Sequence, residues 1–186
     1  MVYDSIIKGK FVTLRSINPD DAEFSYNIRA DKKNRDTVGQ LASSIEAQRD
    51  YIINQMKKPG DYYFVVLNNN NERIGLIGVY DIHGEMGEIG REVNVGEPME
   101  TLEASLLIND FCRNVLKLKK LCYVIYSNNK KNISNVKKRG GNFIGYVERS
   151  GVKALYYEDE LSNTIESENK IRKMLERLAN RDEHKG

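Results

Sequence analysis

Two kinds of apolar pattern alternate along this chain, and their order leaves few folds open. Short runs rich in β-branched and aromatic residues predict strands over residues 11–17, 61–67, 73–82, 88–95, 121–126, 143–147 and 152–157. Helices are predicted after residue 18, from about 43 to 57, from a start between 97 and 101, over 132–139 and from 167. Because hairpins mix with strand-helix-strand crossovers, the chain is expected to be an α/β (α+β) protein. Its mixed central sheet of about seven strands would be flanked by helices and followed by an extra C-terminal helix.

The helices carry recognisable start signals and apolar faces. Asn18 can cap a helix whose first position is Pro19, and Ser43 and Glu46 have the spacing of a capping box. One later helix repeats its apolar residues at helical intervals: Ala104, Leu107, Ile108, Phe111 and Val115. That helix is expected to bury one face against the sheet.

The length and composition fit a single domain over residues 1–186. The chain is 40% hydrophobic and 30% charged, with no apolar run near the about 20 residues that cross a bilayer and no secretion signal, so a cytoplasmic protein away from membranes is expected. Cys112 and Cys122 lie in apolar segments without metal-site spacing and are expected to be reduced core residues. His83 and His184 are the only histidines, which gives little material for a metal site or a histidine-dependent triad. No metal is expected.

Basic residues gather between residues 117 and 139, although the net charge is only +2. They are Lys117, Lys119, Lys120, Lys130, Lys131, Lys137, Lys138 and Arg139. Such a run is commonly a solvated face, and the alternative is an anion site for a phosphorylated cofactor or a nucleic acid. The near-neutral total charge disfavours nucleic acid.

The segment 88–95 alternates apolar and polar residues. Ile89, Val93 and Val95 are expected on one face of this strand, and Glu88, Glu92 and Asn94 on the other. This pattern predicts two carboxylates side by side on one strand.

Three stretches, taken together and in this order, resemble the GNAT acetyltransferases, particularly the branch of ribosomal-protein N-terminal acetyltransferases. They are the opening Gly9-Lys10-Phe11-Val12-Thr13-Leu14-Arg15, then Glu88-Ile89-Gly90, and finally Asn129-Lys130-Lys131-Asn132 through Lys138-Arg139-Gly140-Gly141. The resemblance implies a GNAT-like sheet whose fourth and fifth strands splay apart to admit the pantetheine arm of acetyl-CoA. Backbone groups near Val93 and Val95 would pair with pantetheine, and the start of the following helix would hold the pyrophosphate.

The cofactor contacts implied by this resemblance are Val93, Asn94, Val95, Gly96, Met99, Glu100, Thr101, Leu102, Asn129 and Asn132. The family has a glycine-rich loop before the helix, whereas this chain has Glu97 and Met99 at the glycine positions. The nearby acids would oppose a pyrophosphate unless they point away. They could instead merely complement the helix dipole, and loss of cofactor binding is the other alternative. Asn129 could contact the cofactor or simply cap the next turn.

The resemblance also implies catalytic residues. Glu88 matches a glutamate that serves as the base in several family members, and Glu92 follows it on the same strand; either could also be a solvated strand acid. Val136 stands where the family often has a tyrosine acid. Tyr126 or Ser127 could replace that acid, although Tyr126 could also be a buried tyrosine with a satisfied hydroxyl group.

The expected function is direct transfer of the acetyl group from acetyl-CoA to a primary amine, assisted by a glutamate of the fourth strand. The acceptor would be chosen by the loop 31–40 and the hairpin at Ser150, and a protein N-terminus, an amino-sugar nucleotide and a polyamine all stay open. A catalytically inactive GNAT fold that serves as a binding module is the alternative. The protein is expected to be a monomer or a homodimer.

Overall fold

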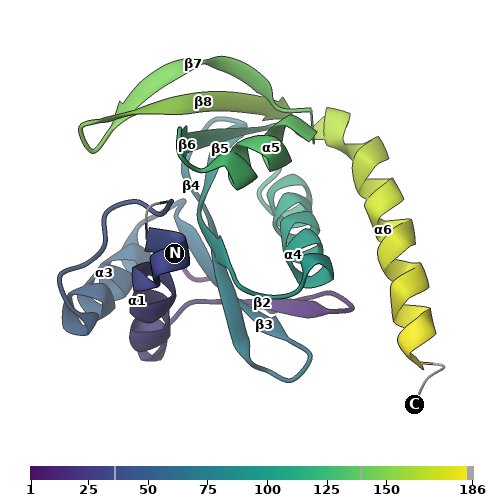
Figure 1. Ribbon diagram of the computed structural model, residues 1–186, viewed down its shortest axis with the longest axis horizontal. Coiled ribbons are helices and arrows are strands. Elements are labelled where there is room, and N and C mark those ends of the chain that lie inside the picture. The colour runs from purple at the N-terminus through teal and green to yellow at the C-terminus, as the bar shows by residue number, and fades with distance from the viewer. Residues whose placement is uncertain (36, 139, 184–186) are drawn as a thin grey trace.

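A single eight-stranded sheet organises the computed structural model, which describes residues 1–35, 37–138 and 140–183 (Figure 1). Its strands are β1 (Ile7–Lys8), β2 (Val12–Ser16), β3 (Tyr62–Asn68), β4 (Arg73–His83), β5 (Met86–Asn94), β6 (Lys120–Tyr126), β7 (Asn142–Arg149) and β8 (Val152–Glu160). They lie in the order β1-β2-β3-β4-β5-β6-β8-β7, and every neighbouring pair is antiparallel except the parallel pair β5 and β6. The predicted mixed sheet is confirmed, and the two-residue β1 is the additional strand.

Helices cover both faces of this sheet. They are α1 (Ala22–Ala30), α2 (Lys32–Arg35), α3 (Ile45–Lys57), α4 (Pro98–Asp110), α5 (Lys130–Lys138) and α6 (Leu161–Glu183), with a 3-10 turn η1 (Pro19–Asp21) and a π-helical turn η2 (Phe111–Val115). In Figure 1, α1 and α3 lie on one side of β3 and β4 and α4 lies on the other, while α6 runs along the outside beside α4. The predicted C-terminal helix is therefore present, and it begins before residue 167.

The two faces of the sheet have separate apolar cores. On the α4 side, Phe64, Ile77 and Val79 pack with residues of α4 and η2. On the α1 and α3 side, Tyr63 and Leu76 pack with residues of those helices. Neighbouring residues of β3 and of β4 thus point to opposite cores, as a strand buried on both faces requires.

Two local expectations about helices are wrong. The N-cap of α3 is Ser44 and not Ser43, because the Ser44 hydroxyl oxygen accepts a hydrogen bond from the Ala47 amide at 3.1 Å. Val115 does not join the apolar face of the α4 segment but is 45% exposed. The chain widens into a π-helical turn over η2, which breaks the spacing that would have kept Val115 on that face.

Glu103 joins α4 to the start of β2. Its buried carboxylate accepts hydrogen bonds from the backbone amides of Lys10, Phe11 and Val12 at 2.8, 2.6 and 2.9 Å. A side chain at Gly9 would collide with the same carboxylate. Residues 9–12 therefore form a binding site for the Glu103 carboxylate, which we call the socket.

A second buried acid orders the entry into α1. Asp21 accepts two hydrogen bonds from the Arg15 guanidinium at 2.7 Å each and one from Arg73 at 2.9 Å. It also accepts the Asn18 amide at 2.9 Å, which closes the predicted helix start. Burial alone would raise the pKa of Asp21, but the hydrogen bonds from Arg15 and Asn18 and the two positive charges hold it below the usual value.

The two cysteines lie in the core and the lysines of the basic run lie on the surface, as the sequence predicts. Cys112 and Cys122 are free and buried, and burial raises the pKa of Cys122 to about 11. The lysines of the basic run are exposed, on α5 and around the start of β6, while Arg139 and His184 lie outside the described residues. Among the helices of the described segments, none is both long and apolar enough to cross a membrane.

Candidate active site

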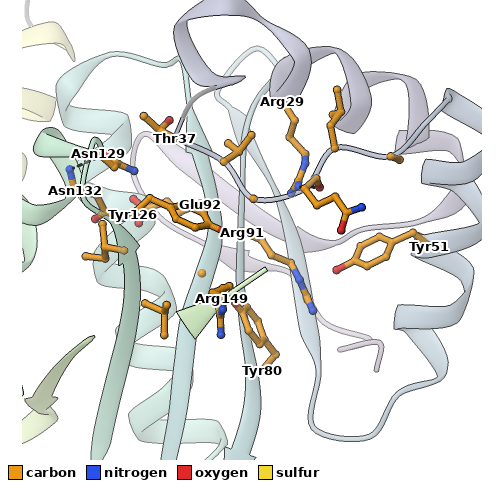
Figure 2. Close-up of a pocket in the computed structure, with 18 of the residues that line it drawn as sticks. Arg29, Thr37, Tyr51, Tyr80, Arg91, Glu92, Tyr126, Asn129, Asn132 and Arg149 are labelled. Atoms are coloured by element: carbon orange, nitrogen blue, oxygen red, sulfur yellow. Dashed lines mark hydrogen bonds between the residues drawn. The ribbon is translucent and has the colours of Figure 1, made fainter. Parts of the chain in front are cut away.

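The parallel strands β5 and β6 stay together only at their first residues. Met86, Gly87 and Glu88 pair with Lys120, Leu121 and Cys122, and beyond these pairs the two strands separate. A cavity of about 610 Å³ lies at the separation, lined by β5, β6, α1, α3 and the residues 37–43 (Figure 2). The predicted splay of the sheet is therefore present.

A β-bulge in β5 changes the direction of its side chains. The register with β4 shifts between Leu76 and Gly78, and Arg91 adopts a positive φ of 53°. Ile89 consequently lies in the core on the α4 side and Val93 in the core on the α1 side. The expectation that Ile89 and Val93 share a face, opposite a shared face of Glu88 and Glu92, is wrong because the extra residue at the bulge reverses the alternation.

The Arg91 side chain packs against a cluster of aromatic rings. Its guanidinium carbon lies 4.1 Å from the ring centroid of Tyr80 and 5.3 Å from that of Tyr63. The buried Asp61 accepts two hydrogen bonds from Arg91. Burial would raise the pKa of Asp61, but these hydrogen bonds and the Arg91 charge hold it below the usual value. The bulge is thereby fixed by a buried ion pair.

Glu88 is engaged in a buried network and does not line the cavity. Both of its carboxylate oxygens accept hydrogen bonds from Arg149, the last residue of β7, and Oε1 also accepts the Tyr80 hydroxyl at 2.7 Å. Hydrogen bonding to Glu88 raises the pKa of Arg149, and burial together with Glu88 raises that of Tyr80. The Glu88 carboxylate is therefore directed at Arg149 and Tyr80 and not at the cavity.

Glu92 and Tyr126 do line the cavity, from β5 and from the end of β6 (Figure 2). Tyr126 is only partly buried, and within the described part of the chain its hydroxyl group has no hydrogen-bond partner. The alternative of a buried tyrosine with a satisfied hydroxyl group is therefore wrong. Glu92 is partly exposed on the opposing strand. These two side chains give the cleft a carboxylate and a phenol that have no hydrogen-bond partner among the described residues, and Tyr51 adds a further phenol to the lining.

Three arginines line the same cavity, and sequence reasoning missed all of them. Arg91 and Arg149 are each paired with an acid, Asp61 and Glu88. Arg29 donates from Nη2 to the Gln40 carbonyl at 2.9 Å, and its buried Nε has no partner among the described residues. No short motif marks these residues, because their partners are distant in sequence. Arg29 is the cation of this cavity that no described carboxylate balances.

The implied cofactor residues of β5 point in two directions. The Val95 amide donates to the Ile74 carbonyl of β4 at 2.9 Å, and Val93 is paired with Leu76 of the same strand. Because successive residues of a strand turn their backbone groups to opposite sides, those of Asn94 face the β6 side. The backbone available to a pantetheine arm is therefore that of Asn94, between the two valines named by the sequence.

The amides at the start of α4 are used by the chain itself. Gly96 donates to the Asn94 side chain at 2.8 Å, Glu97 donates to the Glu100 carboxylate at 2.7 Å, and Pro98 has no N–H group. A Cβ at Gly96 would lie 2.5 Å from Glu100 Oε2, so this carboxylate covers the backbone. The residues at this helix start do not fit a pyrophosphate as they stand.

The remaining implied cofactor residues lie around the cleft entrance or on the surface. Thr101, Asn129 and Asn132 line a small cavity of about 80 Å³ beside Glu92. Asn129 accepts the Asn132 amide at 3.1 Å and so caps the start of α5, as one of the two alternatives expected. Met99 is half-buried and Leu102 is 37% exposed. Within the described ranges no cluster of three metal-ligating side chains occurs.

The model of the family described as "Acetyltransferase (GNAT) domain" matches residues 12–142. A search among curated proteins found no match.

Solved structures share this fold. A nucleotide-linked sugar GNAT, FdhC in its apo form, is 19% identical, with a TM-score of 0.76 over 93% of this chain and 99% of that one. A GCN5-related N-acetyltransferase from Brucella melitensis is 13% identical, with a TM-score of 0.78 over 93% and 86%. A mutant form of the spermidine/spermine N-acetyltransferase SpeG from Vibrio cholerae is 16% identical, with a TM-score of 0.68 over 86% and 99%. At these identities the likeness concerns the fold.

Proposed function

The chain belongs to the GNAT family of acetyltransferase domains, and on that basis we propose that it is an N-acetyltransferase that moves the acetyl group of acetyl-CoA to a primary amine. The observation that carries the proposal is the cavity between β5 and β6, which has Glu92 on one strand and Tyr126 on the other. An alkylammonium ion with a pKa of about 10.4 is almost wholly protonated at neutral pH and cannot attack a carbonyl group. A carboxylate and a phenol facing one cleft supply the base and the acid that such a transfer needs.

In the proposed reaction the amine nitrogen bonds to the acetyl carbonyl carbon, and the carbon–sulfur bond of the thioester breaks. Glu92 accepts the proton that the amine loses, directly or through one water molecule. Tyr126 gives its hydroxyl proton to the departing thiolate and regains one from solvent. Asn94 offers its backbone groups to the pantetheine arm along the open edge of β5.

Glu88 has a positioning role in this scheme. Its two oxygens hold the Arg149 guanidinium, and Arg149 lines the cavity beside Tyr80. Of the two glutamates on β5, Glu92 is therefore proposed to assist the transfer, because its carboxylate faces the cleft.

The charge of the cavity bears on the acceptor. Three arginines and one glutamate line it, and Asp61 and Glu88 pair with two of the arginines. Arg29 and Glu92 are the charged side chains of the lining that have no ion-pair partner among the described residues. An amine joined to a phosphate or carboxylate would set its anion against Arg29 and its ammonium group against Glu92, whereas a polyamine offers Arg29 only positive charge. Among the acceptors left open, an amino-sugar nucleotide fits this charge, and the FdhC structure is that of a nucleotide-linked sugar GNAT.

A panel of acceptors tests the proposal. The protein is incubated with acetyl-CoA and each of three amines: an amino-sugar nucleotide, a short peptide with a free N-terminus, and spermidine. Release of free thiol is followed with a colorimetric reagent, and the acetylated product is identified by mass spectrometry. We expect turnover with the anionic amine and at least about tenfold lower kcat/KM with spermidine, a difference of about 1.4 kcal/mol. Turnover with spermidine alone would contradict the charge argument.

The inactive binding module is the second candidate, and the closed start of α4 is the observation that favours it. Thermal unfolding separates the two. A ligand at about 100 times its Kd stabilises the fold by about 2.7 kcal/mol. A shift in Tm with acetyl-CoA but no thiol release on the whole panel would establish the module and exclude the enzyme.

A further inference from the structure

Residues 96–98, at the start of α4, offer no free N–H group of the kind with which a helix N-terminus binds an anion. Such a site works because the first N–H groups of a helix are unpaired and point outward. Here the Gly96 amide is taken by Asn94, the Glu97 amide by Glu100, and Pro98 has none to give. The Gly96 and Glu97 donors are satisfied inside the chain before any ligand arrives, and the next amide, that of Met99, lies between Glu97 and Glu100 in the sequence.

Charge and space act in the same direction. Glu97 and Glu100 place two carboxylates where a pyrophosphate would have to lie, and like charges at short range repel. The space bordered by Asn94, Thr101 and Asn132 is about 80 Å³, whereas the cavity at the strand separation is about 610 Å³. The room and the open backbone edge are on the pantetheine side of the site.

We infer that this protein holds its thioester donor through the acyl group and the pantetheine arm alone, without gripping the adenosine diphosphate half at α4. The inference rests on the proposed function for the identity of the donor. The recognised chemistry is an acetyl thioester of pantetheine, whether that arm belongs to CoA or to a carrier protein. The exposed Lys131 lines the small cavity and the exposed Lys130 precedes it on α5, and both suit the surface of an acidic carrier.

Binding measurements give the direct test. The Kd values of CoA, pantetheine and adenosine 3′,5′-bisphosphate are measured by calorimetry on the full chain. We expect CoA and pantetheine to bind within about fivefold of one another, and the bisphosphate not to compete at millimolar concentration. Preference for CoA over pantetheine by about 100-fold or more, or competition by the bisphosphate, would overturn the inference. Equal binding of CoA and pantetheine without any turnover would support the inference and contradict the proposed acetyltransferase activity.

Kinetics extends the test to the source of the arm. The kcat/KM is compared for acetyl-CoA, S-acetylpantetheine and an acetylated acyl carrier protein with one amine. If the inference is right, the kcat/KM of S-acetylpantetheine or of the acetylated carrier protein lies within about fivefold of that of acetyl-CoA. The donor with the higher value identifies the source of the arm. A protein that accepts acetyl-CoA and rejects both others contradicts it.

A variant that frees the helix start connects the result to the structure. Replacing Glu97 and Glu100 together by Gly and Ala removes both carboxylates and releases the Glu97 amide. We expect this double variant to bind CoA at least about tenfold more tightly relative to pantetheine. The exposed Glu23→Ala on α1 is the matched control and should leave that ratio unchanged. If the ratio of CoA affinity to pantetheine affinity stays at the wild-type value in the double variant, the two carboxylates are not what prevents pyrophosphate binding at the start of α4.

Discussion

At the scale of single residues, function in this cleft depends on which polar atoms remain free. Glu88 and Glu92 are four positions apart on one strand. The Glu88 carboxylate accepts hydrogen bonds from Arg149 and Tyr80, whereas Glu92 faces the cavity. The sequence places both acids correctly on β5. It cannot reveal the partner of Glu88, because Arg149 is 61 residues away and reaches it only through the fold.

Glu92→Gln tests the proposed base. Glutamine keeps the shape of the side chain but cannot take a proton, so kcat should fall by about 10²–10⁴. Below the pKa of the amine the variant should gain about tenfold per pH unit, because more of the amine is then already neutral. Steady-state kinetics from pH 6.5 to 9.5 provides the measurement, with the exposed Glu23→Gln as control. Full activity in Glu92→Gln would remove Glu92 as the base.

Tyr126→Phe tests the proposed acid. Removing the hydroxyl group should lower kcat by about 10² with acetyl-CoA, because the thiolate must then leave unprotonated. A donor whose thiol is more acidic leaves readily without help, so the defect should shrink with an aryl thioester. A defect of equal size with both donors would indicate that Tyr126 acts by packing.

At the scale of elements, helix ends and hairpins follow from local rules, and the bulge does not. Asn18 caps its turn, and Asn71 takes a positive φ of 61° in the hairpin between β3 and β4, both through local side-chain chemistry. The bulge at Arg91 is different, because a basic residue has no intrinsic preference for positive φ. Its conformation is imposed by the buried Asp61 and the Tyr80 ring, so no pattern within β5 could have predicted it.

The socket that joins α4 to β2 should contribute strongly to stability. In Glu103→Gln the side chain keeps one acceptor oxygen for three backbone amides and loses its charge. We expect the free energy of unfolding to fall by about 2–4 kcal/mol, since hydrogen bonds to charged groups contribute about 1.5–3 kcal/mol each. Urea unfolding with an unchanged m value provides the measurement. The exposed Glu176→Gln should change little, and a comparable loss there would discount the socket.

At the scale of the whole molecule, two buried aspartates link stability to pH. The pKa values of Asp21 and Asp61 are lowered in the folded protein, mainly because arginine hydrogen bonds outweigh burial. A depressed folded pKa means that the contribution is fully present above the unfolded value of about 3.9 and is lost as pH falls through the folded value. The mixed sheet that presents these acids was predictable from element order, but their pairing was not.

Asp61→Asn should therefore reveal a pH-dependent loss. At pH 7 the variant leaves Arg91 largely buried without its counter-charge, and the free energy of unfolding should fall by about 3 kcal/mol. The difference from the wild type should narrow below about pH 4, where the Asp61 carboxylate of the unfolded chain takes up a proton before that of the folded protein does. Urea unfolding at pH 7, 5 and 3 measures both values. A difference that stays constant with pH would mean that the ion pair contributes through shape and not charge.

The short pairing between β5 and β6 also divides the sheet into two units. Strands β1 to β5 form a continuous antiparallel meander of sequence neighbours, while β6, β8 and β7 form a second antiparallel set in which β6 pairs with β8. Within the sheet the two are joined at Met86, Gly87 and Glu88 of β5. Local opening should follow this join, so amide hydrogen exchange of β6 to β8 should occur at a lower free energy than that of β2 to β4. A thioester lying between the strands would bridge both units. Its binding should then slow exchange on each side of the join together, and the protein would be most resistant to opening while it holds its donor.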